Sequence, residues 1–125
     1  MHRFAKLARG LNRRRGEMNA TETAYSVVLD AMQQSGEIGQ WWFEPMSFRL
    51  SSPPSGQPAR YTPDFMILRS CGEVWIIDVK ASKGFDDKAS VVRVKAAAEL
   101  FPLFRFFVAY KRPKKSGGGF ELIEV

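Results

Sequence analysis

The sequence has almost no histidine and almost no cysteine. Its only histidine is His2, close to the amino terminus, and its only cysteine is Cys71. A single histidine so near a chain end excludes enzymes that need an imidazole in the core, such as Ser-His and Cys-His hydrolases and histidine-bearing zinc hydrolases. A single cysteine excludes a disulfide framework and a cysteine-rich zinc site, so we interpret Cys71 as a reduced turn residue.

Long apolar runs are also missing. No stretch approaches the length of about 18 apolar residues that a membrane span requires, and no signal-peptide core is present. We therefore expect a soluble, cytoplasmic protein that does not contact a membrane. With 125 residues, 45% hydrophobic and 26% charged, the chain has a globular composition. It is long enough for one domain that buries roughly two-thirds of its unfolded surface.

Acidic residues are absent from residues 1–16, which hold six of the basic residues. The net charge of +6 comes from 19 basic and 13 acidic residues, so this segment carries the whole excess. We predict a flexible basic arm over residues 1–16, joined to a single domain over residues 17–125. Its arginines, Arg13, Arg14 and Arg15 among them, are expected to contact nucleic acid phosphates. A solubilising tail is one alternative, and a membrane-surface helix with a weak Phe4-Leu7-Leu11 stripe is another.

Two β-prone runs carry charges where strand interiors are normally apolar. Asp64 lies at the mouth of the first run, in Tyr61-Thr-Pro-Asp-Phe65, and Asp78 and Lys80 lie inside the second, Val74-Trp-Ile-Ile-Asp-Val-Lys80. A turn containing Cys71 and glycine favours an antiparallel hairpin, which brings Asp64 near Asp78. Strand side chains alternate between faces, so Asp78 and Lys80 share one face.

Buried charges are costly unless they meet each other, a metal or a ligand. Two carboxylates and a lysine that converge at a sheet end favour a divalent-metal site for phosphodiester hydrolysis. The alternative is an ordinary surface pair of Asp78 and Lys80 at the end of a strand.

A third carboxylate comes from the helix predicted over residues 19–35. Its apolar stripe contains Tyr25 and Leu29, and Gly36 suits the position after its end. Glu22 lies three residues before Tyr25 and therefore projects from the core-facing side of the first turn. Glu22 either forms a capping box with Asn19 or delivers a carboxylate to the metal site.

The remaining pattern predicts strands over residues 41–50, 60–68, 73–80 and 104–110, a helix over residues 87–101, and a last strand that begins at Phe120. Pro45 breaks the first of these strands, so we expect an edge position or a bulge there. The element order is α-β-β-β-α-β-β. The hairpin and a parallel crossover through the second helix predict an α/β fold with a mixed sheet flanked by helices.

These motifs resemble the PD-(D/E)xK signature of the restriction-endonuclease-like superfamily: a helical Glu22, then Pro63-Asp64, then Asp78-x-Lys80. Tyr61-Thr-Pro-Asp-Phe65, Ile77-Asp-Val-Lys80, Gly84 and Asp86-Asp87-Lys88 are also similar to the phage endonuclease I family of Holliday junction resolvases. The resemblance runs from about Glu22 to Tyr110. The chain departs from that family in having Asp78 where glutamate is common, and in lacking a long basic carboxy-terminal extension.

The resemblance implies a restriction-endonuclease-like core and a metal-dependent DNA endonuclease that resolves branched DNA as a homodimer, in the host cytoplasm if a phage encodes it. It implies four catalytic residues, Glu22, Asp64, Asp78 and Lys80. One or two Mg²⁺ or Mn²⁺ ions would be held by Asp64, Asp78, Glu22 and the carbonyl of Val79. Lys80 would position the attacking water and stabilise developing negative charge.

Further basic side chains are candidate contacts for DNA phosphates: Lys83, Lys88, Arg93, Lys95, Lys111, Arg112, Lys114 and Lys115. Three alternatives to a resolvase stay open. The protein could be a nicking or duplex-cleaving nuclease of a phage or mobile element, an inactive DNA-binding protein on the same fold, or a structural phage protein that holds nucleic acid with its basic arm.

Overall fold

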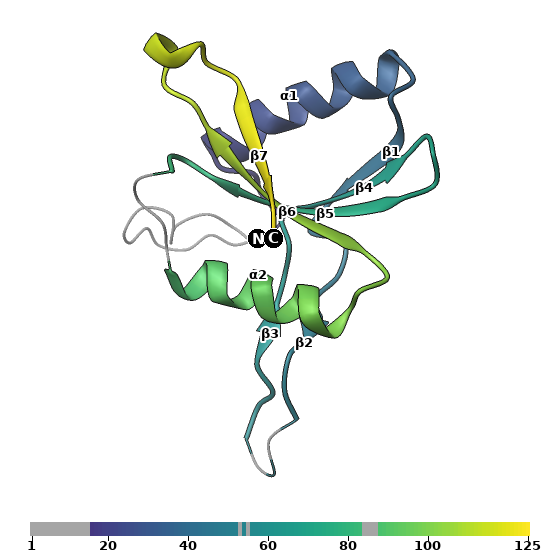
Figure 1. The fold of residues 1–125 in the computed structure, drawn as a ribbon, viewed down its shortest axis with the longest axis vertical. Helices are drawn as coiled ribbons and strands as arrows, with labels where there is room; N and C mark the ends of the chain where they lie inside the picture. Colours follow the sequence, from purple (N-terminus) through teal and green to yellow (C-terminus); the bar gives the residue numbers. More distant parts are fainter. Residues whose placement is uncertain (1–15, 53, 55, 84–87) are drawn as a thin grey trace.

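The computed structural model describes residues 16–52, 54, 56–83 and 88–125. Its main body is a five-stranded mixed sheet with one helix on each face (Figure 1). In spatial order the strands are β1 (Ile38–Phe43), β4 (Phe65–Arg69), β5 (Val74–Lys80), β6 (Arg105–Lys111) and β7 (Phe120–Glu124). The helices are α1 (Ala20–Gln34) and α2 (Lys88–Leu100). The predicted mixed sheet with two flanking helices is confirmed at this level.

Helix α1 begins and ends where its sequence signals predict. The Asn19 side chain accepts a hydrogen bond from the Glu22 backbone N–H and caps the first turn. Gly36 follows the last turn with φ of +85°, a backbone conformation that glycine adopts without the strain of a Cβ atom.

The hairpin and the crossover around β5 are also confirmed. Strands β4 and β5 are antiparallel with Phe65 opposite Ile77, and β5 and β6 are parallel with Ile77 beside Phe107. Asp64 immediately precedes β4, so the register continues it to the position opposite Asp78. The strand pairing therefore brings the two carboxylates to the same end of the sheet.

Two of the predicted strands are wrong, because each is divided between two sheets. The run predicted over residues 41–50 breaks after β1 at Glu44, which has φ of +47°, and at Pro45, which lacks an N–H for the ladder. The run over residues 60–68 breaks at the turn containing Pro63. The outer pieces, β2 (Phe48–Arg49) and β3 (Arg60–Tyr61), pair antiparallel as a separate ribbon. The basic segment between β6 and β7 contains a short 3-10 helix, η2 (Lys114–Ser116).

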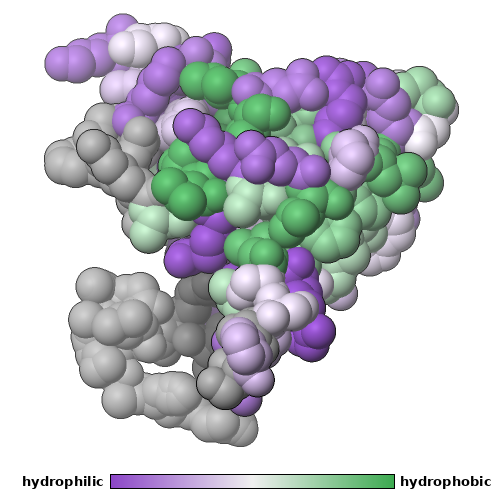
Figure 2. Space-filling view, turned by 60° about the horizontal axis from the view of Figure 1, so that its bottom comes forward, coloured by the Kyte–Doolittle hydropathy of each residue, from purple (hydrophilic) through white to green (hydrophobic). Residues whose placement is uncertain are grey.

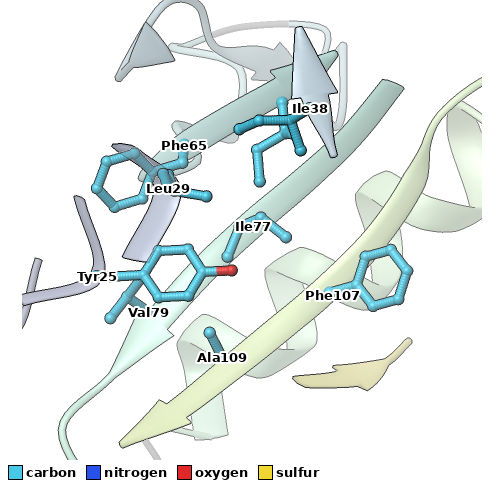
Figure 3. Close-up of a cluster of buried hydrophobic side chains, with 9 residues drawn as sticks. Tyr25, Leu29, Ile38, Phe65, Ile77, Val79, Phe107 and Ala109 are labelled. Atoms are coloured by element: carbon cyan, nitrogen blue, oxygen red, sulfur yellow. The ribbon is translucent and has the colours of Figure 1, made fainter. Parts of the chain in front are cut away.

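The sheet buries a different apolar cluster on each face. On the α1 face, Tyr25 and Leu29 of the helix pack against side chains of the sheet, including Phe65, Ile77 and Val79 (Figure 3). On the α2 face, the cluster consists of Phe48, Tyr61, Ile76, Val94, Ala97, Phe106, Val108 and Tyr110. Because Ile77 and Val79 face α1, the intervening Asp78 faces α2.

Helix α2 leaves part of its side of the sheet uncovered. A groove of about 580 Å³ lies between α2 and strands β6 and β7, and its apolar lining includes Val91, Ala98 and Ile123. Figure 2, which brings this side of the molecule forward, shows apolar residues gathered among hydrophilic ones. In the part of the chain that the structure describes, no helix has the length and apolar character of a membrane span.

Candidate active site

Asp78 is buried in a network of side-chain contacts at the end of β5. It is only 5% exposed. The Tyr61 hydroxyl donates a hydrogen bond to Oδ1 of Asp78 at 3.1 Å, and Nζ of Lys80 lies 3.0 Å from Oδ2. Lys80 also donates a hydrogen bond to Oγ of Ser90 on α2 at 2.6 Å. The two charges do pair across one pleat, but the alternative of an ordinary surface pair is wrong because Asp78 is buried.

Tyr61 and Ser90 also belong to the site through their hydroxyl groups, and the sequence analysis did not predict either of them. Burial, followed by the negative charges of Asp78 and Asp64, raises the pKa of Tyr61, so its hydroxyl stays protonated and remains a donor. Tyr61 lies 17 positions from Asp78, and Ser90 lies 12 positions from it. No local pattern connects residues so far apart. The only available signal was the place of Tyr61 in the Tyr61-Thr-Pro-Asp-Phe65 motif.

The Asp64 side chain continues the hydrogen bonding between β4 and β5 past the last backbone pair. Its Oδ2 accepts a hydrogen bond from the Val79 backbone N–H at 2.7 Å, in place of a backbone partner on β4. The N–H and C=O of one residue in an antiparallel ladder point toward the same neighbouring strand. The Val79 carbonyl is therefore directed to the Asp64 side, as its predicted part in a metal site requires.

Asp64 lies within the electrostatic influence of both other carboxylates. Burial, then the negative charge of Asp78 and, more weakly, the charge and hydrogen bonding of Glu22 raise its pKa, while the Val79 N–H acts in the opposite direction. The result is a pKa of about 9 instead of the ordinary 3.8. Three carboxylates so close together favour a bound proton or a bound cation at this position.

Glu22 fulfils the capping role and also reaches the site. Its Oε1 accepts a hydrogen bond from the Asn19 backbone N–H at 2.9 Å, which completes the capping box. The same side chain contributes to the raised pKa of Asp64, and Glu22 is only 4% exposed. The two alternatives for Glu22 therefore do not exclude each other: the capping box holds this carboxylate at the end of the sheet beside Asp64.

The structure shows the capping role of Glu22, and the family resemblance implies a metal-binding role; together they predict that the Glu22 charge matters more to metal-dependent cleavage than to folding. Glu22→Gln keeps an oxygen acceptor for the Asn19 N–H and removes the negative charge beside Asp64. We expect the free energy of unfolding to stay within about 1 kcal/mol of wild type, the usual size of a lost cap, and metal-dependent cleavage to fall at least about tenfold. Urea unfolding and single-turnover cleavage measure the two quantities.

The matched control is Asn19→Ala, which removes the capping side chain and keeps the Glu22 charge. This variant is expected to lose about 1 kcal/mol of stability and to cleave at close to the wild-type rate. Wild-type cleavage by Glu22→Gln would show that Glu22 is a cap and nothing more.

The raised pKa of Asp64 predicts a particular pH dependence of stability in the absence of metal. Between about pH 4 and pH 9 the folded protein holds a proton on Asp64 that the unfolded chain releases, so this contribution favours folding at low pH and is lost as pH rises. The slope approaches 1.4 kcal/mol per pH unit at most, roughly the value for one proton. Thermal melting in EDTA should show Asp64→Asn gaining stability relative to wild type as pH rises. Parallel pH profiles for the two proteins would contradict the raised pKa.

The donor set fits a hard divalent cation. Carboxylate and carbonyl oxygens, here from Glu22, Asp64, Asp78 and Val79, are the ligands that Mg²⁺ and Mn²⁺ take. Among the described residues, however, no group of three or more histidine, cysteine, aspartate or glutamate side chains is already spaced to hold a metal ion. The carboxylates contact protein donors instead: Tyr61 and Lys80 for Asp78, Val79 for Asp64 and Asn19 for Glu22. Metal binding would have to exchange some of these contacts.

The predicted DNA contacts are spread over several surfaces. The basic arm lies outside the described residues except for Gly16, so Arg13, Arg14 and Arg15 are not placed, and the side chain of Lys88 is not described either. Lys83, Lys111 and Arg112 line one hollow of about 370 Å³, where Lys83 also lies 3.5 Å from Glu121. The others are exposed: Lys114 and Lys115 in η2, Arg93 on α2, and Lys95 on α2 beside the apolar groove.

Comparison of the chain with family models, with curated proteins and with solved structures found no match. The resemblance to PD-(D/E)xK nucleases therefore stays a prediction that rests on the motifs and on the way the fold arranges them.

Proposed function

We propose that this protein is a metal-dependent DNA endonuclease that hydrolyses phosphodiester bonds, with branched DNA such as a four-way junction as its substrate. The observation that carries the proposal is the position of Asp64. It lies beside both Glu22 and Asp78, and Asp78 in turn contacts Lys80. Three carboxylates and a lysine at one end of a sheet provide both a cation site and a positive charge for the reacting phosphate.

In the proposed mechanism Asp64, Asp78, Glu22 and the Val79 carbonyl would hold one or two Mg²⁺ or Mn²⁺ ions. A bound ion of this kind makes its water a stronger nucleophile and withdraws charge from a phosphoryl oxygen. Lys80 would orient the attacking water and stabilise the negative charge that develops on the phosphate. Ser90 holds the Lys80 ammonium from the side of α2, and Tyr61 fixes the orientation of the Asp78 carboxylate.

The choice of substrate follows from the family resemblance and from charge. Lys83, Lys111 and Arg112 gather around one hollow, and a phosphate backbone would find there three cations with one opposing carboxylate, Glu121. A homodimer would supply two such sites, as cleavage of two strands of a junction needs. The basic arm over residues 1–16 would add further phosphate contacts that carry no sequence information.

A second candidate is a DNA-binding protein that retains this fold without catalysis. It is favoured by two observations: the described residues contain no ready-made metal group, and Asp78 and Lys80 neutralise each other at 3.0 Å. In that case the ion pair would be a structural contact and not a part of the reaction.

Cleavage assays with Mg²⁺ on a four-way junction and on a matched linear duplex separate the candidates. A resolvase cuts the junction in preference to the duplex, and EDTA abolishes the reaction. Equal cutting of both substrates indicates a duplex nuclease, and nicks in only one strand indicate a nicking enzyme. Binding of both DNAs without cleavage by Mg²⁺ or Mn²⁺ would overturn the proposed enzyme and favour the inactive DNA-binding protein.

A further inference from the structure

The β2–β3 ribbon carries two arginines directly opposite each other. The strand register pairs Phe48 with Tyr61 and Arg49 with Arg60. Residues that face each other across an antiparallel pair project to the same side, and neighbouring positions project to the other. Phe48 and Tyr61 are buried, whereas Arg49 and Arg60 are exposed. One side of the ribbon therefore packs against the domain, and the other presents two guanidinium groups to solvent.

The two arginines make the ribbon less stable than it could be. Like charges directly opposite each other destabilise a strand pair, and this ribbon has only two residue pairs in its ladder. Within the described residues neither arginine lies at ion-pair distance from a carboxylate. Arg105, by contrast, lies 3.1 Å from Glu73 and 2.7 Å from Glu124. The arginine pair therefore presents positive charge that no described carboxylate neutralises, and this charge attracts anions.

The ribbon is firmly attached to the domain in spite of its short strands. The ring centroid of Phe48 lies 4.8 Å from that of Phe101 and 5.5 Å from that of Phe106. The Leu50 N–H donates a hydrogen bond to the Ala59 carbonyl at 2.8 Å and extends the pairing beyond the two strands. A positive surface on such a ribbon has a fixed place relative to the sheet.

That place is close to the candidate active site. Tyr61 donates the hydrogen bond that holds Asp78 from the inner face of the ribbon, and Arg60, the preceding residue of β3, projects from the outer face at the same end of the strand. The Arg60 Nη1 donates a weak hydrogen bond of 3.4 Å to Ser47 Oγ, which draws the guanidinium toward the base of the ribbon and not out along its loop.

We propose that Arg49 and Arg60 form a clamp for the backbone phosphates of the DNA duplex that adjoins the cleaved bond. This inference rests on the proposed function. The ribbon extends past α2 and away from the five-stranded sheet (Figure 1), so the clamp holds one duplex arm to one side of the site. Because it contacts phosphates alone, it strengthens binding without selecting a base sequence.

The experiment compares wild type with Arg49→Ala/Arg60→Ala and with the charge-preserving control Arg49→Lys/Arg60→Lys. Binding to a four-way junction and to a linear duplex is measured in EDTA over a range of salt concentrations. Loss of one or two phosphate contacts should make the slope of log affinity against log salt less negative by about 0.9 to 1.8. Affinity at low salt should fall roughly tenfold for each lost contact. The lysine variant should keep the wild-type slope.

Thermal melting separates a lost contact from a damaged fold. Removal of the like-charge pair should leave the melting temperature of the alanine variant equal to or above that of wild type. Equal salt slopes and affinities for wild type and the alanine variant would overturn the clamp, even if wild type cleaves the junction. A lysine variant that binds DNA as weakly as the alanine variant, and that melts at a lower temperature than wild type, would also overturn the clamp.

Different experimental results would overturn the proposed clamp and the proposed nuclease activity. A wild-type protein that never cleaves with Mg²⁺ or Mn²⁺, yet shows a salt slope that depends on Arg49 and Arg60, overturns the nuclease and supports the clamp. A wild-type protein that cleaves the junction with no change in binding on loss of both arginines overturns the clamp alone. A protein that binds neither DNA overturns both.

Discussion

Asp64→Asn is expected to abolish Mg²⁺-dependent cleavage and to leave DNA binding intact. Among the described carboxylates, Asp64 is influenced by both Glu22 and Asp78, so in the proposed site it would contribute to binding of one ion or of two. The asparagine oxygen can still accept the Val79 N–H, so the end of β5 should keep its structure. We expect the single-turnover rate to fall by more than about 10³-fold, beyond the loss usual for one preorganised donor.

Asp30→Asn is the matched control for this variant. It makes the same chemical change at an exposed carboxylate of α1, which accepts a hydrogen bond from the Trp41 indole at 3.0 Å. This control should cleave and bind like wild type. Cleavage by Asp64→Asn within about tenfold of the wild-type rate would remove Asp64 from the mechanism, and loss of DNA binding along with cleavage would point to a phosphate contact or a damaged fold.

Lys80→Ala is expected to slow the chemical step by about 10²- to 10³-fold, which corresponds to about 3–4 kcal/mol of transition-state stabilisation. The Lys80 ammonium is fixed between Asp78 and Ser90, so it is preorganised for charge that develops nearby. Junction affinity should stay nearly unchanged, because this side chain is only 17% exposed and is already paired with Asp78. Single-turnover rates at saturating enzyme and equilibrium binding in EDTA distinguish the two quantities.

Lys95→Ala provides the contrast for Lys80→Ala. Lys95 lies on α2 beside the apolar groove, so its removal can weaken a DNA contact but should not change the rate of the bound complex. A Lys80→Ala variant that loses affinity and keeps its rate at saturation would reassign Lys80 as a phosphate contact.

The sequence was sufficient for the elements whose signals are local. Asn19 and Gly36 mark the ends of α1, and the turn at Cys71 leads to the antiparallel pairing of β4 with β5. The alternation along β5 also predicts that Asp78 and Lys80 share the face opposite Ile77, as the two apolar clusters show. These features depend on periodicity and on turn chemistry, which act over a few residues.

The ribbon was not predictable from the same rules. Residues 41–50 alternate well enough for one strand, and only the positive φ of Glu44 and the missing N–H of Pro45 direct the second half into another sheet. Pairing of Phe48 with Tyr61 then depends on the packing of Phe48 against Phe101 and Phe106, which are distant in sequence. The opposition of Arg49 and Arg60 follows from that pairing and has no signal of its own.

In the candidate site, too, some features follow from local sequence signals and others depend on tertiary packing. Proximity of Asp64 and Asp78 follows from the hairpin, and the position of Glu22 follows from the helix cap. The contacts that orient Asp78 and Lys80 come from Tyr61 of the ribbon and Ser90 of α2, and both depend on tertiary packing. Catalysis by these residues stays a prediction from their chemistry.

We propose above that Glu22, Asp64 and Asp78 bind a divalent cation, and an anomalous difference map from crystals grown with Mn²⁺ tests this most directly. We predict a peak between Asp64 and Asp78, on the side to which the Val79 carbonyl is directed, and no such peak for Asp64→Asn under the same conditions. A map in which Asp78 stays bonded to Tyr61 and Lys80, with manganese bound elsewhere or not at all, would contradict the claim.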